Sequence, residues 1–256
     1  MGKINSRQGK TVVITGGTRG IGAGIAREFY ARGYAVVLAA RHDNGSARKL
    51  GPRAFFVKTD VTSDEDQARL VREAVRRTGG LDVFVNGAGL SRWAPIGTID
   101  PGAFKEMLAV NLEGVFWGCK AAAGVLAAGG VIINVASLAG RRGSANNSAY
   151  CAAKFGVIGL TQALAKELGP RGIRVNAVCP VYVPTDGVLK ALAEKVSPAA
   201  GKNVAAYLKD FALTQAALKR LPTAAEVGGV CVFLASDAAS AVTGQSINVD
   251  CGVMPQ

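Results

Sequence analysis

Ser137, Tyr150 and Lys154 carry side chains that together suit the reduction of a carbonyl group. Such a reaction delivers hydride to carbon and a proton to oxygen, so it needs an acid beside the carbonyl oxygen. A free tyrosine, with a pKa of about 10, is a poor acid–base catalyst at neutral pH. A lysine four residues further along a helix lies on the same face, where its charge lowers that pKa. The spacing predicts a proton-transfer pair; the alternative is a buried ring beside a lysine that reaches solvent.

A glycine-rich segment, residues 15–22 (TGGTRGIG), separates the first predicted strand from the first predicted helix. Glycines at such a turn let the backbone approach a pyrophosphate, which then sits on the helix N-terminus. A tight turn without a ligand is the alternative, but this position is the one that a dinucleotide-binding motif requires. We therefore expect cofactor contacts from Gly16, Thr18, Gly20, Ile21 and Gly22.

The end of the second predicted strand favours NADP(H) over NAD(H). Sites for NAD usually place an acidic residue there, which binds the ribose 2′-hydroxyl. Here the strand ends Leu38-Ala39-Ala40-Arg41, without a carboxylate. Arg41 and Arg19 carry planar guanidinium groups that bind phosphate oxygens in pairs, so we expect both to contact a 2′-phosphate. The alternative is that both are solvated surface arginines.

Short apolar runs alternate with longer helical patterns, which is typical of βαβ units on a parallel sheet. The predicted strands span residues 11–15, 35–39, 54–58, 81–86, 131–136, 174–179 and 245–249. The predicted helices span residues 21–32, 64–77, 103–127, 148–167 and 224–234, and Thr62 with Glu65 resembles a capping box. The pattern predicts a Rossmann-like, doubly wound α/β fold with seven parallel strands and helices on both faces. We expect a single domain over residues 1–256, with residues 181–221 forming a substrate lid.

The composition is that of a globular protein with a strong basic excess. Of the 256 residues 49% are hydrophobic and 19% charged, which excludes intrinsic disorder. Thirty Lys and Arg against eighteen Asp and Glu leave a net charge of +12, as in many proteins that bind nucleic acid or anionic membranes. The basic residues are scattered without a nucleic-acid-binding motif, so we expect no such partner. The uncharged stretch 121–140 contains Gly129-Gly130 and Asn134, which indicate a helix end, a turn and a strand rather than a membrane span.

The remaining composition bears on location and assembly. The cysteines are odd in number and widely spaced, which favours reduced, buried thiols over a disulfide framework or a metal site: Cys119, Cys151, Cys179, Cys231 and Cys251. The polar, basic residues 1–10 lack a secretory signal, so we expect a cytoplasmic protein. The helix that begins at Ser148 is apolar almost all round and must be buried on every face. We therefore expect a homo-oligomer, a homotetramer or a dimer.

The pattern Ser-x12-Tyr-x3-Lys, with TGxxxGIG upstream, resembles the short-chain dehydrogenase/reductase family over residues 10–252. Further segments match it: Asp60-Val61, Asn86-Gly87-Ala88-Gly89, Val110-Asn111-Leu112, Thr243-Gly244-Gln245 and Val249-Asp250. The resemblance implies that Tyr150 is the general acid/base and that Lys154 activates it and binds the nicotinamide ribose. It implies that Ser137 binds the substrate oxygen and that Asn111 holds a water linking Lys154 to solvent. It also implies cofactor contacts from Asp60, Val61, Asn86, Gly87, Ala88, Val181 and Thr185.

Three positions depart from the family pattern. Gly87 stands in place of a second asparagine, Val181 in place of a glycine, and Cys251 where a glycine is common. The first change removes a side chain, and the second puts the geometry of the nicotinamide loop in question. None of them alters the catalytic set.

Together these features predict an oxidoreductase that transfers hydride between NADP(H) and a ketone or secondary alcohol. One alternative is a ketoreductase for 3-oxoacyl thioesters on an acidic carrier protein, which the basic surface favours and the long segment 181–221 does not. An alternative of another class is a non-catalytic NADP sensor or nucleic-acid-binding protein; a sensor would be expected to lack Tyr150 or Lys154. Arg92, Arg141 and Arg142 follow predicted strands, where they either meet an anionic substrate or are solvated.

Overall fold

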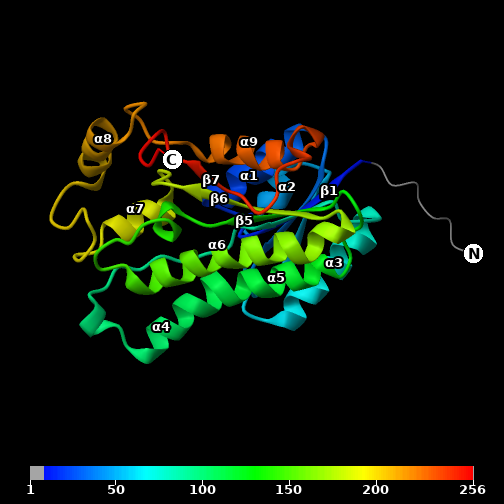
Figure 1. Ribbon diagram of the computed structural model, residues 1–256, viewed down its shortest axis with the longest axis horizontal. Helices are drawn as coiled ribbons and strands as arrows, with labels where there is room; N and C mark the ends of the chain where they lie inside the picture. The colour runs from blue at the N-terminus through cyan, green and yellow to red at the C-terminus, as the bar shows by residue number, and fades with distance from the viewer. Residues whose placement is uncertain (1–8, 256) are drawn as a thin grey trace, which may run out of the picture.

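Seven parallel strands form one sheet in the computed structural model, which describes residues 9–255 (Figure 1). The strands are β1 (Thr11–Thr15), β2 (Ala35–Ala40), β3 (Ala54–Lys58), β4 (Val83–Asn86), β5 (Val131–Val135), β6 (Arg174–Pro180) and β7 (Ser246–Val249). Their order is β3-β2-β1-β4-β5-β6-β7, so the chain winds outward in both directions from β1 and β4. The predicted doubly wound fold is confirmed. Ligands bind such sheets at the carboxyl edge, beside the strands where the winding reverses.

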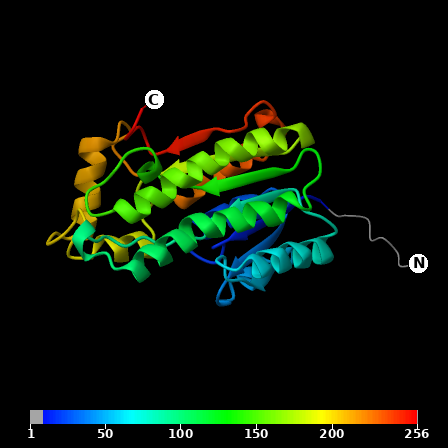
Figure 2. The same ribbon diagram turned by 60° about the horizontal axis from the view of Figure 1, so that its bottom comes forward.

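Helices cover both faces of the sheet (Figures 1 and 2). One face carries α1 (Gly20–Ala31), α2 (Ser46–Leu50) and α9 (Ala224–Leu234), and the other carries α3 (Asp64–Thr78), α4 (Pro101–Leu108), α5 (Gly114–Ala123) and α6 (Ser148–Leu168). A separate apolar cluster fills each side, and the strands contribute alternate residues to the two clusters. Strands that are apolar throughout are therefore required, because both of their faces are covered. Between α1 and α9 the contact is so close that a Cβ at Gly24 would lie 2.5 Å from the Cβ of Ala224.

The prediction of one long helix over residues 103–127 is wrong in its bounds and in its continuity. It is α4, a π-helical turn at Ala109–Glu113 and then α5, which ends at Ala123. Gly124 is the C-cap of α5, and Gly129 in the turn that follows has a positive φ. Wide π-helical turns often occur at functional sites, and this one contains Asn111.

The capping box predicted at Thr62 and Glu65 is also wrong. The N-cap of α3 is Ser63, one residue later, and its hydroxyl accepts the N–H of Asp66. A complete capping box stands instead at the start of α9, between Thr223 and Glu226.

Residues 181–221 form a packed unit beside the carboxyl edge of the sheet. They contain two short helices, α7 (Asp186–Leu192) and α8 (Val204–Gln215). Leu192, Ala199 and Leu208 are buried in a third apolar cluster that belongs to this segment alone. The ring of Tyr182 packs on Phe211 of α8 with centroids 5.0 Å apart. In Figure 1 α8 lies beyond the end of the sheet, next to the C-terminus.

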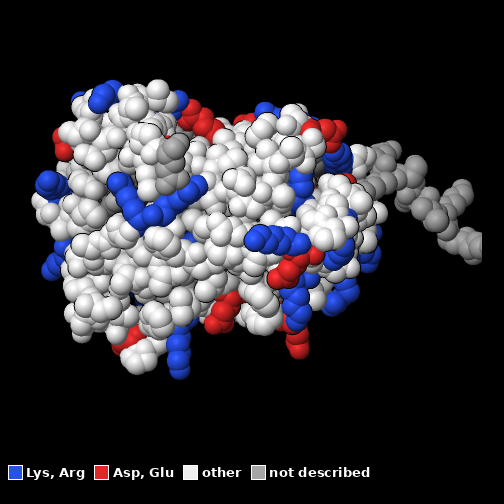
Figure 3. Space-filling model, viewed as in Figure 1, with Lys and Arg blue, Asp and Glu red and all other residues white. Residues whose placement is uncertain are grey.

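The surface carries its positive charge in dispersed form. In Figure 3 lysines and arginines are scattered over the visible face with acidic side chains between them. Within residues 9–255 no helix combines the length and the apolar character that crossing a membrane requires. The expectation that the chain lacks a secretory signal concerns residues 1–10, and residues 1–8 of these lie outside the described residues. Four of the five cysteines are buried free thiols, as the sequence indicated, and Cys251 is half-buried.

Candidate active site

Ser137 and Tyr150 meet at the carboxyl edge of the sheet. Ser137 follows β5 and begins a 3-10 turn, where its Oγ accepts the N–H of Ala139 at 3.1 Å. Tyr150 lies in the first turn of α6, where the Ser137 side chain is near enough to its hydroxyl to act on its pKa. The structure therefore brings together the serine and the tyrosine that the spacing selected. A carbonyl oxygen placed between these two hydroxyl groups would contact both.

The ammonium group of Lys154 is buried directly behind this pair. Its Nζ lies 5.6 Å from the centroid of the Tyr150 ring and donates a hydrogen bond to the Val135 carbonyl at 2.9 Å. Only 3% of the residue is exposed, and burial lowers the pKa of the lysine to about 8. The alternative of a lysine that extends to solvent is wrong. The cation is held in place by the last residue of β5.

Burial raises the pKa of Tyr150 to about 12, and the neighbouring Ser137 side chain opposes this shift. The predicted lowering of the tyrosine pKa by Lys154 is not found in this geometry. Burial is the largest influence on the phenol, and the lysine amine is directed at the Val135 carbonyl rather than at the phenolic oxygen. At neutral pH Tyr150 is therefore protonated, as a proton donor has to be.

Asn111 is fully buried in the π-helical turn and connects it to the segment after β4. Its side-chain amide accepts the N–H of Leu90 at 3.2 Å and donates to the Leu90 and Met107 carbonyls at 2.9 and 3.0 Å. A Cβ at Gly89 would lie 3.0 Å from Asn111 Oδ1 and 3.8 Å from Lys154 Nζ. Asn111 is thus a near neighbour of the lysine, as the resemblance implies.

The glycine-rich turn fits a dinucleotide pyrophosphate. No side chain caps α1 and no acidic residue occupies its first turn, so its N–H groups and positive dipole end are left for an anion. Side chains cap α3, α4, α8 and α9, whereas α2, α6 and α7 share with α1 the lack of a side-chain cap. A Cβ at Gly16 would lie 2.8 Å from the Gly87 carbonyl, and one at Gly22 would lie 2.3 Å from the Gly16 carbonyl. Ile21 is half-buried, and Thr18 is buried in the same turn.

Two residues that the sequence reasoning missed fix this turn from the side. The Nδ2 of Asn44 and the Oγ of Ser46 both donate to the Thr18 carbonyl, at 3.0 and 2.9 Å. Asn44 also accepts the N–H of Ser46, in a turn that has Gly45 at a positive φ. The Asn-Gly-Ser sequence was a signal for this turn, but nothing in it indicates that the turn docks on the glycine loop. The loop after β2 is therefore hydrogen-bonded to the glycine loop through the Thr18 carbonyl.

Arg19 and Arg41 leave the same edge of the sheet. Thr15 at the end of β1 is paired with Ala39 of β2, and Arg19 and Arg41 follow these strand ends. Both arginines are exposed, and Arg41 acts electrostatically on Asp60. The pKa of Asp60 is lowered chiefly by hydrogen bonds from Thr62. Val61, beside it, packs against Gly114 at the start of α5.

The side chain of Asn86 turns into the protein interior. Its Nδ2 donates to Asn134 Oδ1 at 2.9 Å, and Asn134 donates to Thr161 on α6 at 2.9 Å. The side chain therefore joins β4, β5 and α6, which leaves only the backbone of Asn86 for the cofactor contact that the resemblance implies. In the next residues the N–H groups of Gly87 and Ala88 donate to Thr15 Oγ1 at 3.1 and 3.3 Å.

The three departures from the family pattern have structural explanations. A side chain at position 87 would bring its Cβ within 2.8 Å of the Thr15 carbonyl, so glycine allows this close approach. Val181 is outside the positive-φ region, so the backbone does not require glycine there, and its N–H donates to Val249. Cys251 adopts a φ of 55°, a conformation that favours glycine, so its backbone is strained. Thr185 is the N-cap of α7.

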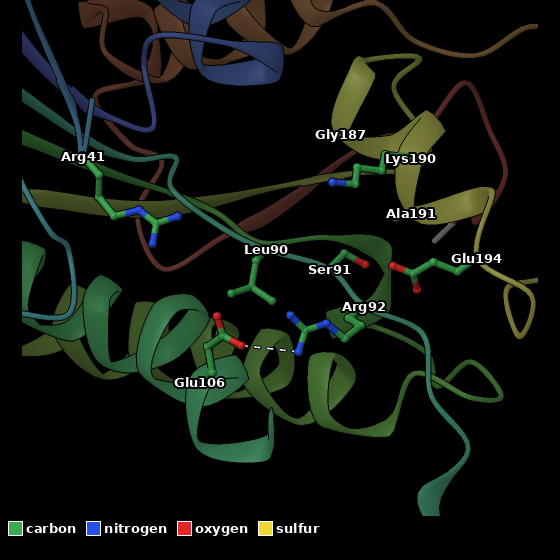
Figure 4. A pocket seen from close by; sticks show the side chains of 9 residues that line it. All are labelled: Arg41, Leu90, Ser91, Arg92, Glu106, Gly187, Lys190, Ala191 and Glu194. Carbon is green, nitrogen blue, oxygen red and sulfur yellow. Dashed lines mark hydrogen bonds and ion pairs between the residues drawn. The ribbon is translucent and has the colours of Figure 1, made fainter. Parts of the chain in front are cut away.

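A cleft of about 440 Å³ follows the carboxyl edge (Figure 4). It is lined by Arg41, Leu90, Ser91, Arg92, Glu106, Gly187, Lys190, Ala191 and Glu194. Its residues come from the end of β2, the segment after β4, α4 and the segment 181–221. The cleft thus connects the place proposed for the adenosine end of a dinucleotide with the expected lid.

The chain matches known proteins over nearly its whole length. A family profile described as enoyl-(acyl carrier protein) reductase matches residues 16–254. The chain belongs to the short-chain dehydrogenase/reductase family.

Individual members of the family are similar from end to end. The cis-4-hydroxycyclohexanecarboxylate dehydrogenase of Sinomonas cyclohexanicum is 39% identical, with 95% of this chain and 96% of that one covered. A crystal structure of a short-chain dehydrogenase/reductase from Brucella melitensis superposes with a TM-score of 0.87 at 34% identity, covering 96% and 97%. Actinorhodin polyketide ketoreductase with NADPH superposes with a TM-score of 0.88 at 30% identity, covering 97% and 98%. The protein is accordingly an oxidoreductase of this family that acts on CH–OH groups.

Within this short-chain dehydrogenase/reductase, the arginines near the strand ends differ in role. Arg141 turns inward, donates to the Ser246 carbonyl of β7 and is hydrogen-bonded to the Cys179 thiol of β6, so it joins strands instead of facing a substrate. Arg92 pairs with Glu106 at 3.4 Å, and both side chains are half exposed. Arg142 is exposed.

The segment 181–221 is fastened to two of the loops that surround the site. Glu194 accepts the N–H of Trp93 at 2.9 Å, and Asn146 donates to the Val196 carbonyl at 3.1 Å. Asn146, which has a φ of 57°, also accepts the N–H of Ala94 at 2.7 Å. Nothing in the sequence around Glu194 indicates this contact, because its partner is a backbone group 101 residues away.

The lowered pKa of Lys154 predicts a pH-dependent stability. Below pH 8 the folded protein holds a buried ammonium, and as the pH rises from about 8 to 10.5 the native state releases this proton before the unfolded chain does. The unfolding free energy of the wild type minus that of Lys154→Met should therefore increase over this range, by on the order of 2 kcal/mol. Urea denaturation at several pH values measures this difference.

Lys166→Met is the matched control, since Lys166 lies on the same helix and is exposed. Its difference from the wild type should stay constant over this pH range. An equally flat profile for Lys154→Met would contradict the buried ammonium.

Proposed function

We propose that the protein transfers hydride between NADP(H) and a ketone or secondary alcohol, with Tyr150 as the general acid/base. The observation that supports this most strongly is the placement of Tyr150, with Ser137 acting on its hydroxyl, over the buried ammonium of Lys154 at 5.6 Å from the ring centroid. When bound, the dinucleotide supplies hydride to the carbonyl carbon or accepts it from the alcohol. We further propose a cytoplasmic enzyme of one domain without nucleic-acid or membrane partners.

The protein supplies the proton and stabilises charge in this reaction. Ser137 donates a hydrogen bond to the substrate oxygen and holds it beside the Tyr150 hydroxyl. As hydride reaches the carbon, the phenol proton passes to the oxygen, giving the alcohol and a phenolate. The positive charge of Lys154 stabilises that phenolate in a site shielded from solvent. Asn111, next to Lys154, would hold a water through which the proton is replaced from solvent.

The cofactor is held by backbone at its centre and by side chains at its ends. The uncapped N-terminus of α1 and Gly16, Gly20 and Gly22 would take the pyrophosphate, with Thr18 and Ile21 beside it. Asp60 and Val61 would contact adenine, and the backbone at Asn86, Gly87, Ala88, Val181 and Thr185 would contact the nicotinamide half. Lys154 and Tyr150 would bind the nicotinamide ribose.

The preference for NADP(H) rests on Arg19 and Arg41. Both follow the paired ends of β1 and β2, and no carboxylate stands at the end of β2 to bind a ribose 2′-hydroxyl. Guanidinium groups match phosphate in both charge and geometry. The similar polyketide ketoreductase was solved with NADPH, which supports the same choice.

Two substrate classes follow from the relatives. The dehydrogenase of Sinomonas cyclohexanicum is named for a small secondary alcohol, and the packed lid segment 181–221 suits a substrate of that size. A 3-oxoacyl-[acyl-carrier-protein] reductase of Chlamydia muridarum, 32% identical to this chain, favours the second class, a 3-oxoacyl chain on a carrier protein. A cyclic ketone and a 3-oxoacyl thioester, compared by kcat/KM, separate the two, and we propose that the ketone is preferred.

Replacing Tyr150 with phenylalanine should abolish the reaction. The variant lacks the donated proton, so turnover of any ketone substrate should fall by about a hundredfold to ten-thousandfold. NADPH binding, followed by fluorescence, should change less than about twofold, because the phenolic proton donor is not a main source of cofactor affinity. Tyr34→Phe, which changes a tyrosine just before β2 at the opposite edge of the sheet, should keep full activity. Retained turnover in Tyr150→Phe would rule out this mechanism.

Replacing Arg41 with alanine should change the cofactor preference. Loss of a charge-assisted contact with the 2′-phosphate should weaken NADPH binding about tenfold to hundredfold and leave NADH binding nearly unchanged. Equilibrium titration with each dinucleotide measures both values. Arg72→Ala on α3 is the control for net charge. Equal weakening of both dinucleotides would contradict a contact with the 2′-phosphate.

We also propose that the protein is a homotetramer or a dimer. Phe116 on α5 and Phe155 on α6 are 44% and 47% exposed on adjacent helices (Figure 2). A second copy that covers this face would bury both rings. Phe155→Glu should lower the sedimentation coefficient at micromolar concentration, whereas Leu213→Glu on α8 should not. A wild type that sediments as a monomer would exclude the assembly.

A further inference from the structure

The cleft of Figure 4 receives two cations from opposite sides. The side chain of Arg41 enters from the end of β2, and that of Lys190 enters from α7 and extends toward the same space. Like charges that face each other across a cleft repel, and an anion between them removes this repulsion. The pair therefore points to an anionic occupant.

Neither of the two carboxylates of the cleft forms an ion pair with Lys190. Glu106 pairs with Arg92 at 3.4 Å, and Glu194 accepts the backbone N–H of Trp93 at 2.9 Å. Within residues 9–255 the amine of Lys190 takes part in none of the ion pairs or hydrogen bonds, which leaves its three N–H groups for a ligand. Because Lys190 is exposed, its ammonium group is also accessible to a molecule that enters the cleft.

The position of α7 indicates which anion this is. Thr185, the N-cap of α7, lies against the glycine loop: a Cβ at Gly20 would be 3.8 Å from the Thr185 side chain. The helix therefore begins beside the N–H groups of α1 that suit a pyrophosphate. Side chains on a helix lean toward its N-terminus, so Lys190 leans back toward that turn.

We infer that Lys190 binds the diphosphate of the bound dinucleotide and thereby fixes α7 over the cofactor. This inference rests on the proposed function and adds a cofactor ligand that comes from the lid segment. Arg41 would take the 2′-phosphate at the far end of the cleft, so the two cations bind different phosphates. Since Glu194 of the same segment is bonded to Trp93, binding of the diphosphate by Lys190 also holds the loop after β4 in place.

Cofactor titrations of the full-length protein without substrate test the inference. Lys190→Met should weaken NADPH and NADH alike by about tenfold, because both dinucleotides carry the diphosphate. Lys190→Arg should bind both nearly as well as the wild type. Lys195→Met, which removes an exposed lysine of the same segment that does not line the cleft, should change neither affinity by more than about twofold. Thermal unfolding of all variants checks that each is folded.

Several results would overturn the inference. Unchanged affinities in Lys190→Met would exclude the contact. Weakening of NADPH alone would move the lysine to the 2′-phosphate and refute the diphosphate assignment, and equal losses in Lys195→Met would show a general charge effect. A wild type that binds neither dinucleotide would refute the proposed function, and the inference with it. If the wild type binds both dinucleotides and Lys190→Met binds them equally well, only the inference is refuted.

Discussion

A buried ammonium group fixes the geometry on which this protein depends. Taking a charge out of water is costly unless polar groups receive it, and Lys154 has the Val135 carbonyl at 2.9 Å. That bond sets the distance between the end of β5 and the first turns of α6, which carry Ser137 and Tyr150 respectively. A second polar link, from Asn134 to Thr161, joins the same strand and helix one layer deeper. The proton donor and its serine partner are therefore positioned by the interior of the protein rather than by flexible loops.

The sheet supplies the other half of this arrangement. Because all seven strands are parallel, their carboxyl ends meet at one edge, and segments far apart in the sequence contribute to one cleft. The side chain of Thr15 accepts two N–H groups from Gly87 and Ala88, so the loops after β1 and β4 are bonded to each other. Asn44 and Ser46 bond the loop after β2 to the same region. Cofactor and substrate would thus be bound by loops that support one another.

The parts of this structure that could be predicted are those that local pattern determines. Apolar runs predicted all seven strands, and the spacing of Tyr150 and Lys154 predicted two side chains on one helix face. The π-helical turn around Asn111 could not be foreseen, because the one-residue shift it makes in the apolar pattern is hidden in residues 107–123, which are apolar at most positions. The contact of Glu194 with Trp93 could not be foreseen either, since a backbone N–H has no sequence identity. The pKa of Tyr150 was predicted in the wrong direction, because burial depends on the whole fold while spacing reports only one neighbour.

The apolar cluster of residues 181–221 has an evolutionary consequence. Leu192, Ala199 and Leu208 pack within their own segment and contribute to neither cluster of the sheet. Mutations in α7 and α8 can therefore reshape this segment while Val181 and Val183, which pack against the clusters of the sheet, keep its start in place. A lineage can in this way acquire new specificities while its reaction stays the same, and a designer can vary the residues of α7 and α8 that neither join the sheet's clusters nor contact the cofactor. The sequence of the sheet and the sequence of α7 and α8 can therefore diverge at different rates.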